Sequence, residues 1–171
     1  VYLQVSGGYN SIDGVPLDDG DWVWIGDSGP DGTISVNLTS TKAESKSIRA
    51  HGDGMLIPES IAVEIPAGDP DALQIFLVGE TAVPGDDPGK TGLPEDTYMG
   101  EPSQISIQAV DSHWNPLADV SGTVSIQTTD PAVVIPETVQ LVDGQASVAV
   151  TWMTAGQQTM TLSLDDPAIS G

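Results

Sequence analysis

The fold is decided by two stretches that match each other without a gap: DGTISVNLT at residues 31–39 and DGQASVAVT at residues 143–151. The match keeps an offset of 112 residues and continues through Ala43 over Ala155 and Ile48 over Met160. Each copy opens with an Asp-Gly pair, which favours a tight turn, and goes on with alternating side chains. The repeat therefore predicts two copies of one unit, each with a turn, a strand, a second turn and a second strand.

The rest of the chain shows the same period of two. Apolar side chains recur at every second position, as at Ile105 and Ile107 or at Val124 and Ile126, which is typical of half-buried strands. The 19 glycines and 13 prolines divide these runs into short pieces and argue against a helical protein. The expected strands span residues 1–5, 22–25, 33–39, 46–50, 60–65, 73–78, 104–110, 122–127, 139–141, 146–152 and 158–164.

The amino-acid composition limits the classes of partner that this chain is expected to bind. Only 4 basic side chains stand against 25 acidic ones in 171 residues, which gives a net charge of −21. Such a chain repels the phosphates of nucleic acids and the surface of anionic membranes, so neither is expected as a partner. Cations, basic proteins and neutral glycans stay open, and a saline habitat is another explanation for the charge. Cysteine is absent, which excludes disulfides and thiolate metal sites.

The repeat also sets the expected domain boundaries. Residues 1–65 form a partial first unit, residues 66–72 form a linker rich in Pro and Asp, and residues 73–171 form a complete second unit. The offset places the start of the first unit before Val1, so its first strands are expected to be missing. A sandwich without them exposes an unpaired edge, which a longer parent chain or a neighbouring chain could complete by strand addition.

Several stretches of the second unit resemble bacterial immunoglobulin-like repeats, including the invasin-like ones. The sequence DSHWNP at residues 111–116 is similar to their D-x-x-G-N-P turn, with Trp114 where Gly is usual. Residues 122–131 resemble the next strand and its turn, and residues 143–162 resemble the closing hairpin. Residues 73–85 are similar to the opening strand of such domains.

The resemblance implies an all-β fold of two immunoglobulin-like β-sandwiches in tandem, the first incomplete. It also implies a location outside the cell or on the surface of a bacterium. The function expected first is a structural or adhesive spacer in a large surface protein or fibre, with strand complementation between identical chains as one route of assembly. The alternative is a calcium- or carbohydrate-binding accessory module of a secreted enzyme.

The acidic loops are candidates for calcium, the one cofactor considered, because Ca²⁺ takes about six to eight oxygen ligands from clustered carboxylates and carbonyls. One group of candidates lies in loops of the first unit and the other lies near the junction. The competing interpretation is that these are solvated turn aspartates and a hydrated linker. The candidate ligands are Asp18, Asp19, Asp21, Asp27, Asp31, Asp53, Glu64, Asp69 and Asp71.

Trp22 and Trp24 alternate with Val23, which places both indole rings on one face of a strand. Exposed aromatic rings on such a face could stack on sugar rings, whereas the alternative is a core face or a face covered by other strands. No catalytic set is expected. The tetrapeptide Gly-Asp-Ser-Gly at residues 26–29 resembles a serine-protease motif, but no His precedes it in the sequence.

Overall fold

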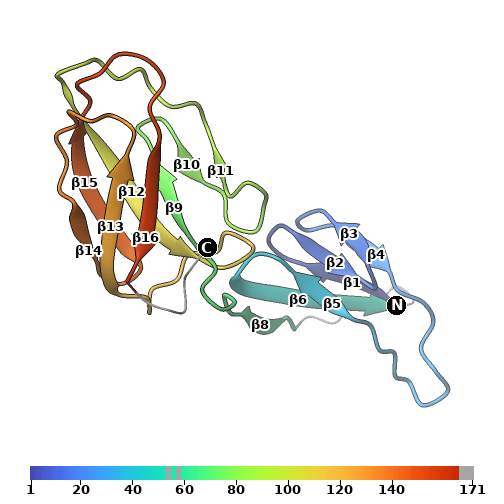
Figure 1. Ribbon diagram of the computed structural model, residues 1–171. Helices are drawn as coiled ribbons and strands as arrows, with labels where there is room; N and C mark the ends of the chain where they lie inside the picture. Colours follow the sequence, from blue (N-terminus) through green and yellow to red (C-terminus); the bar gives the residue numbers. More distant parts are fainter. Residues whose placement is uncertain (53–54, 57–58, 166–171) are drawn as a thin grey trace. The chain divides into compact units, whose positions relative to one another are not determined.

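The computed structural model describes residues 1–52, 55–56 and 59–165. Its contacts divide the chain into two compact units, Val1–Ala67 (unit 1) and Gly68–Gly171 (unit 2). Every regular element in the described residues is a strand, so the all-β prediction is confirmed (Figure 1). No helix among these residues has the length and hydropathy needed to cross a membrane.

Unit 1 contains two antiparallel sheets. The larger sheet has the order β4-β1-β6-β7, and β8 also pairs with β6. The smaller sheet has the order β3-β2-β5. The strands are β1 (Tyr2–Val5), β2 (Asn10–Ile12), β3 (Val15–Leu17), β4 (Trp22–Trp24), β5 (Leu38–Ser40), β6 (Glu44–Gly52), β7 (Met55–Leu56) and β8 (Ile61–Ile65).

Unit 2 contains two three-stranded antiparallel sheets, β15-β12-β9 and β14-β13-β16, and the short hairpin β10-β11. This pairing corresponds to strands A, B and E in one immunoglobulin sheet and to strands C and F in the other. The strands are β9 (Ala72–Phe76), β10 (Thr81–Ala82), β11 (Lys90–Thr91), β12 (Pro102–Val110), β13 (Gly122–Thr128), β14 (Thr138–Leu141), β15 (Gln145–Thr151) and β16 (Met160–Leu164).

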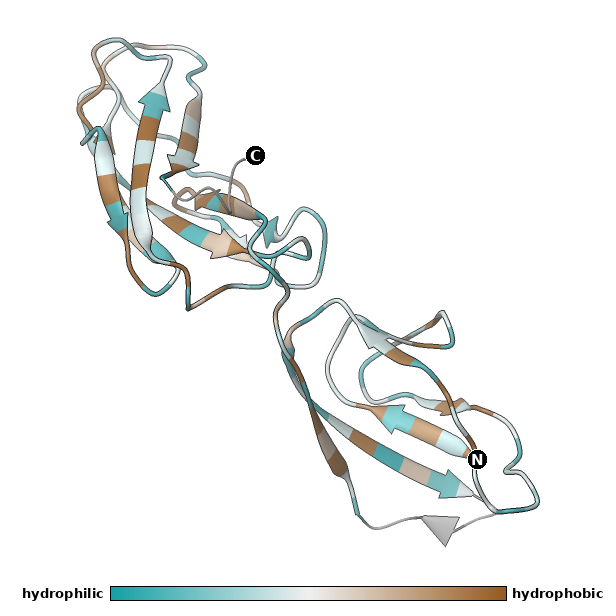
Figure 2. Ribbon diagram, turned by 60° about the horizontal axis from the view of Figure 1, so that its bottom comes forward, coloured by the Kyte–Doolittle hydropathy of each residue, from teal (hydrophilic) through white to brown (hydrophobic). Residues whose placement is uncertain are grey.

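The core of unit 2 follows from the period of two. Along β12, Ile105, Ile107 and Ala109 are almost completely buried, while the residues between them are more exposed. Val124 of β13 and Val150 of β15 are equally buried, so both sheets contribute their apolar faces. Figure 2 shows the resulting alternation of hydrophobic and hydrophilic bands along the strands.

The repeat allows the strand pairing of unit 1 to be compared with that of unit 2. Its strands β5 and β6 match β15 and β16 at the offset of 112 residues. As β16 pairs with β13, so β6 pairs with β1, and β6 gains β8 on its other edge. In the described part of the chain, β5 pairs only with β2, over three residues, whereas β15 pairs with β12 over seven. The smaller sheet of unit 1 therefore has a shorter pairing at this strand than the β15-β12-β9 sheet of unit 2.

One expected strand of unit 1 is much shorter than predicted. The pattern predicted a strand over residues 33–39, but only Leu38–Ser40 forms one. The Gly29 N–H donates to the Thr33 carbonyl, and Asp13 Oδ1 accepts from the Asn37 N–H at 3.0 Å. These backbone groups therefore form hydrogen bonds with turn residues instead of with a neighbouring strand. The matching residues in unit 2 lie within Gln145–Thr151, which pairs with β12.

The turn with the unusual tryptophan is held by a buried carboxylate. Asp111 accepts hydrogen bonds from the N–H groups of His113 and Asn115 at 2.8 and 2.9 Å, and from Gly68 at 2.8 Å. Trp114 has a φ of 64°, the left-handed conformation that Gly adopts most easily. The position where Gly is usual thus keeps its backbone conformation with a tryptophan.

Candidate functional site

The larger sheet of unit 1 presents four ring side chains on one face. Tyr2 in β1 lies directly opposite Trp24 in β4 and opposite His51 in β6. Trp22 lies two residues from Trp24 and therefore on the same face. The other face carries Val5, which is buried. We call the surface formed by Tyr2, Trp22, Trp24 and His51 the aromatic face.

Three rings of the aromatic face, Tyr2, Trp22 and His51, contact one another through His51, and the face stays open to solvent. The rings of Tyr2 and His51 are stacked, with centroids 4.7 Å apart and planes 10° apart. Trp22 meets His51 edge-on, with centroids 4.7 Å apart. Trp24 is 60% exposed, and Tyr2 and Trp22 are each 39% exposed. Exposed aromatic rings gathered on one face make this surface a candidate binding site.

A polar hollow of about 200 Å³ adjoins the aromatic face. Gln4 lies opposite both Trp22 and Arg49, so the side chains of the hollow continue the same face of the sheet. Arg49 is exposed and offers several N–H donors, and Asp19 offers acceptors. The lining residues are Gln4, Ser6, Asp19, Gly20, Ser47 and Arg49.

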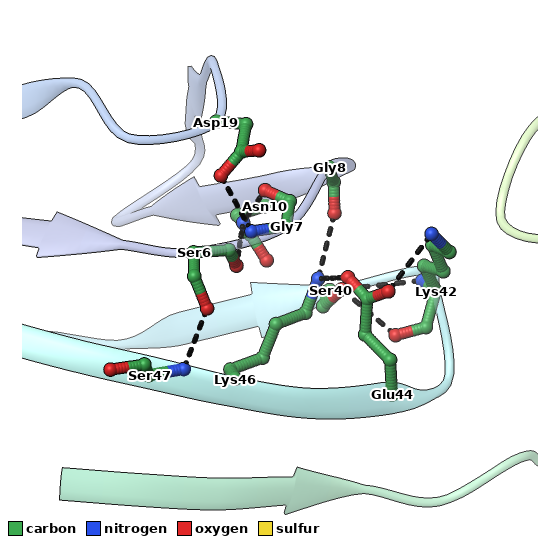
Figure 3. A network of polar contacts seen from close by, with 10 residues as sticks. All are labelled: Ser6, Gly7, Gly8, Asn10, Asp19, Ser40, Lys42, Glu44, Lys46 and Ser47. Atoms are coloured by element: carbon green, nitrogen blue, oxygen red, sulfur yellow. Dashed lines mark hydrogen bonds and ion pairs between the residues drawn. The ribbon is translucent and has the colours of Figure 1, made fainter.

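Hydrogen bonds fix the walls of this hollow (Figure 3). Asp19 Oδ1 accepts from the Gly7 N–H at 2.7 Å, and Ser6 Oγ accepts from the Ser47 N–H at 2.7 Å. Gln4 Nε2 donates to the Gly20 carbonyl at 2.5 Å. The loop after β3 is thereby tied to β1 and to the turn that follows β1.

A buried lysine supports that turn from inside the unit. Lys46 is fully buried, and its Nζ donates to the Gly8 carbonyl at 2.8 Å and to Glu44 Oε1 at 2.6 Å. Glu44 also pairs with Lys42 at 2.8 Å. Partial burial alone would raise the pKa of Glu44, but the two ammonium groups outweigh it and lower the pKa. Figure 3 shows Glu44 between the two lysines.

The combination of rings and polar groups suits a carbohydrate. Aromatic rings pack on the apolar faces of sugar rings, while amide, guanidinium and carboxylate groups exchange hydrogen bonds with hydroxyls. Well-placed polar groups beside apolar surface are the usual composition of a small-molecule site. The aromatic face and its hollow provide both within one sheet.

The sequence placed Trp22 and Trp24 on one face, and the structure leaves that face exposed rather than in the core. The sequence did not indicate that Gln4, Arg49, Tyr2 and His51 belong to this surface. Alternation alone places Tyr2 and Gln4 on one face of one strand, and Arg49 and His51 on one face of another. Only the register of β1 with β4 and β6 brings these two pairs together beside the tryptophans.

The candidate calcium ligands of unit 1 lie on exposed loops. Asp18, Asp19 and Asp21 follow β3, and Asp27 and Asp31 lie between β4 and β5. The Asp31 carboxylate accepts hydrogen bonds from the hydroxyl of Thr33 at 2.9 Å and from its N–H at 3.2 Å, which lowers its pKa. These contacts are those of an Asx turn.

The junction candidates are equally open to solvent. Glu64 lies in β8, Asp69 and Asp71 lie between β8 and β9, and Asp53 lies outside the described residues. Across the described ranges, no three His, Cys, Asp or Glu side chains come close enough to share a metal ion. Calcium binding thus gains no geometric support and stays a prediction.

Comparison with known proteins adds little beyond the fold. No family model matches the sequence, and no curated protein shows a significant match to it. Among solved structures the chain is similar to a glycosyl hydrolase family 2 member from Bacteroides cellulosilyticus, with 12% identity and a TM-score of 0.45. It is also similar to a β-glycosidase from Bacteroides vulgatus, with 13% identity and a TM-score of 0.45. The D0-D1 domain of intimin matches with 17% identity and a TM-score of 0.36.

The three matches differ in how much of each protein they cover. Each covers 99% of this chain, which spans 22% and 20% of the two glycosidases and 76% of the intimin fragment. The chain is therefore about a fifth as long as the enzymes it matches. Similarity at these identities and TM-scores supports no conclusion about activity.

Proposed function

We propose that this chain is a non-catalytic segment of a larger extracellular bacterial protein, and that unit 1 binds a neutral glycan through its aromatic face. The observation that carries the proposal is the row formed by Trp24, Tyr2 and His51 across three strands, with Trp24 60% exposed. The adjoining hollow supplies Gln4 and Arg49 for hydrogen bonds. A neutral glycan also avoids the repulsion that the charge of −21 imposes on anionic polymers.

Calorimetric titration of the full chain with a panel of neutral oligosaccharides tests this proposal. The panel includes β-glucan, xylan, mannan and chitin fragments. We expect dissociation constants in the micromolar to millimolar range for at least one class, and a loss of about tenfold or more in Trp24→Ala. Tyr98→Ala removes an equally exposed ring from unit 2 and serves as the matched control.

Two outcomes contradict the glycan proposal. One is the absence of binding to every member of the panel, and the other is equal affinity of Trp24→Ala and the unaltered chain. Melting curves of both variants show whether a loss of affinity reflects a loss of fold. Because Trp24 is mostly exposed, its substitution is expected to leave the melting temperature almost unchanged.

A second candidate function is that of a spacer whose first unit is completed by strand addition. The specific observation in its favour is β5, which pairs only with β2 in the described residues. An open edge with free N–H and C=O groups accepts an added strand. Light scattering of the full chain distinguishes the cases, because discrete oligomers support addition between chains and a concentration-independent monomer contradicts it.

A further inference from the structure

Unit 2 has a hollow of about 500 Å³ at the end of its sandwich, larger than the hollow of about 200 Å³ beside the aromatic face of unit 1. It lies where the segment between β11 and β12 approaches the residues that follow β15. Its walls include the aromatic rings of Tyr98 and Trp152, the thioether of Met99, and the carboxylates of Glu95 and Asp96. Apolar surface and negative charge thus meet in one hollow, which lies outside the aromatic face of unit 1.

The segment that forms the outer wall is held at both ends. At its start, the Glu95 N–H donates to the Val78 carbonyl at 2.8 Å. Gly79, with a φ of 93°, lets the backbone at Leu93 approach more closely than any side chain would permit. At its end, the Gly100 N–H donates to the Trp152 carbonyl at 2.8 Å. The hollow is therefore a feature of the fold and not of a loosely attached loop.

The apolar groups of this hollow are open to solvent. Tyr98 is 66% exposed and Met99 is 63% exposed. Side chains of this size usually gain stability by packing in the core. Here they instead line a space next to Trp152, which is the arrangement expected of a site that packs against a ligand.

The charge of the hollow is uniformly negative. A second hollow, of about 240 Å³, lies against the same segment and adds Glu101 to Glu95 and Asp96. Among the residues that the structure describes, no Lys, Arg or His lines either hollow. Lys90, the basic side chain nearest in sequence, is engaged with Glu80 at 2.9 Å. The electron-rich faces of aromatic rings add to the attraction for a positive charge.

We propose that this hollow binds an organic cation of the alkylammonium class. The alkyl groups of the cation pack against Tyr98, Met99 and Trp152. The carboxylates of Glu95 and Asp96 lie near its positive charge. An inorganic ion such as Ca²⁺ demands a shell of oxygen ligands and gains nothing from rings and a thioether. An alkylammonium group has an apolar surface and a positive charge, so it uses both kinds of wall.

The test compares a cation with its neutral isostere. Choline and 3,3-dimethylbutan-1-ol have nearly the same shape, but only choline is charged. In ¹⁵N–¹H spectra of the full chain, we expect choline to shift the indole N–H signal of Trp152, assigned with Trp152→Phe. We expect the isostere to bind about tenfold more weakly. A second arm with Nα-acetyl-lysine methylamide shows whether a lysine side chain of a protein is the better source of the cation.

Charge variants make the test specific. The double variant Glu95→Gln and Asp96→Asn should weaken binding of the better cation about tenfold and leave binding of the isostere unchanged. Both residues are exposed, so the variant is expected to keep its fold, which its melting curve checks. Trp24→Ala in unit 1 should not change the affinity for the cation.

The proposal is overturned if the isostere binds as well as both cations, or if the charge variant binds the cation unchanged. It is also overturned if neither cation shifts the Trp152 signal. These outcomes are independent of the glycan proposal, because Trp24→Ala tests the aromatic face and the double variant Glu95→Gln and Asp96→Asn tests this hollow.

Discussion

The two units are built from one repeat, yet they fill their interiors differently. In the described residues of unit 2, twelve apolar side chains are buried, from Ile105 to Leu164. In those of unit 1, only the apolar side chains of Val5 and Ile12 are buried, and Lys46 and Asn10 are buried beside them. A buried ammonium group must be compensated by hydrogen bonds and a counterion, whereas buried apolar surface stabilises directly.

The difference teaches that a shared strand pattern does not guarantee a shared core. In unit 2, β12 pairs with β15 along seven residues and brings Ile105 and Ile107 against the opposite sheet. In the described residues of unit 1, β5 is only three residues long and pairs with β2 over three residues. Within the described residues, unit 1 therefore relies less on buried apolar side chains and more on the polar contacts of Lys46.

The largest expected effect comes from separating the units. A fragment of residues 68–171 should melt cooperatively, because the buried core and the Gly68 bond to Asp111 stay within it. A fragment of residues 1–67 should show no cooperative transition, because its apolar core is too small. Calorimetry of both fragments checks this, and a sharp transition for residues 1–67 would show that the polar network suffices.

The next largest effect is a cavity in unit 2. Ile107→Ala removes a side chain that is only 1% exposed, and we expect it to lower the free energy of unfolding by about 2–5 kcal/mol. Ser106→Ala, on the exposed face of the same strand, is the matched control and should have little effect. Denaturant unfolding of the fragment of residues 68–171 measures both, and equal effects would contradict the core assignment.

A smaller effect is expected from the ion pair in unit 1. Glu44→Gln leaves the buried Lys46 ammonium without its counterion and should destabilise unit 1 in the full chain by about 2 kcal/mol. Lys46→Met removes the buried charge itself and should cost less, because Glu44 keeps Lys42. Hydrogen exchange of the β6 amides in the full chain compares the two variants, and the reverse order would contradict this account.

The smallest effect concerns acid stability of unit 2. Burial opposes ionisation of Asp130, but the Thr154 hydroxyl and the N–H groups of Ala132, Met153 and Thr154 outweigh it and lower its pKa to about 2. The stability that this carboxylate contributes is therefore complete above about pH 4 and is lost as the pH falls through about 2.

Melting curves between pH 5 and pH 2 test the role of Asp130. The gap in melting temperature between the unaltered fragment of residues 68–171 and Asp130→Asn should be largest near pH 5 and should narrow toward pH 2. Asp119→Asn, at an exposed position, should follow the unaltered fragment throughout. A gap that does not change with pH would show that the ionised carboxylate contributes no specific stability.

Much of the fold could be predicted from alternation alone. The expected strands at residues 104–110 and 122–127 correspond to β12 and β13 within one or two residues, because both are long and strictly alternating. The hairpin of β2 and β3, which turns at Asp13 and Gly14, was not among the expected strands. Strands of three residues carry too few positions for a period to be visible.

The sequence by itself determined the strand period, the turns, the repeat, the acidity and the fact that Trp22 and Trp24 share a face. Only the tertiary structure decided that this face is open to solvent and that Tyr2 and His51 extend it. The period shows which side chains point the same way, but pairing between strands far apart in the sequence determines their neighbours. The same holds for Tyr98 and Trp152, which lie 54 positions apart in the sequence and line one hollow.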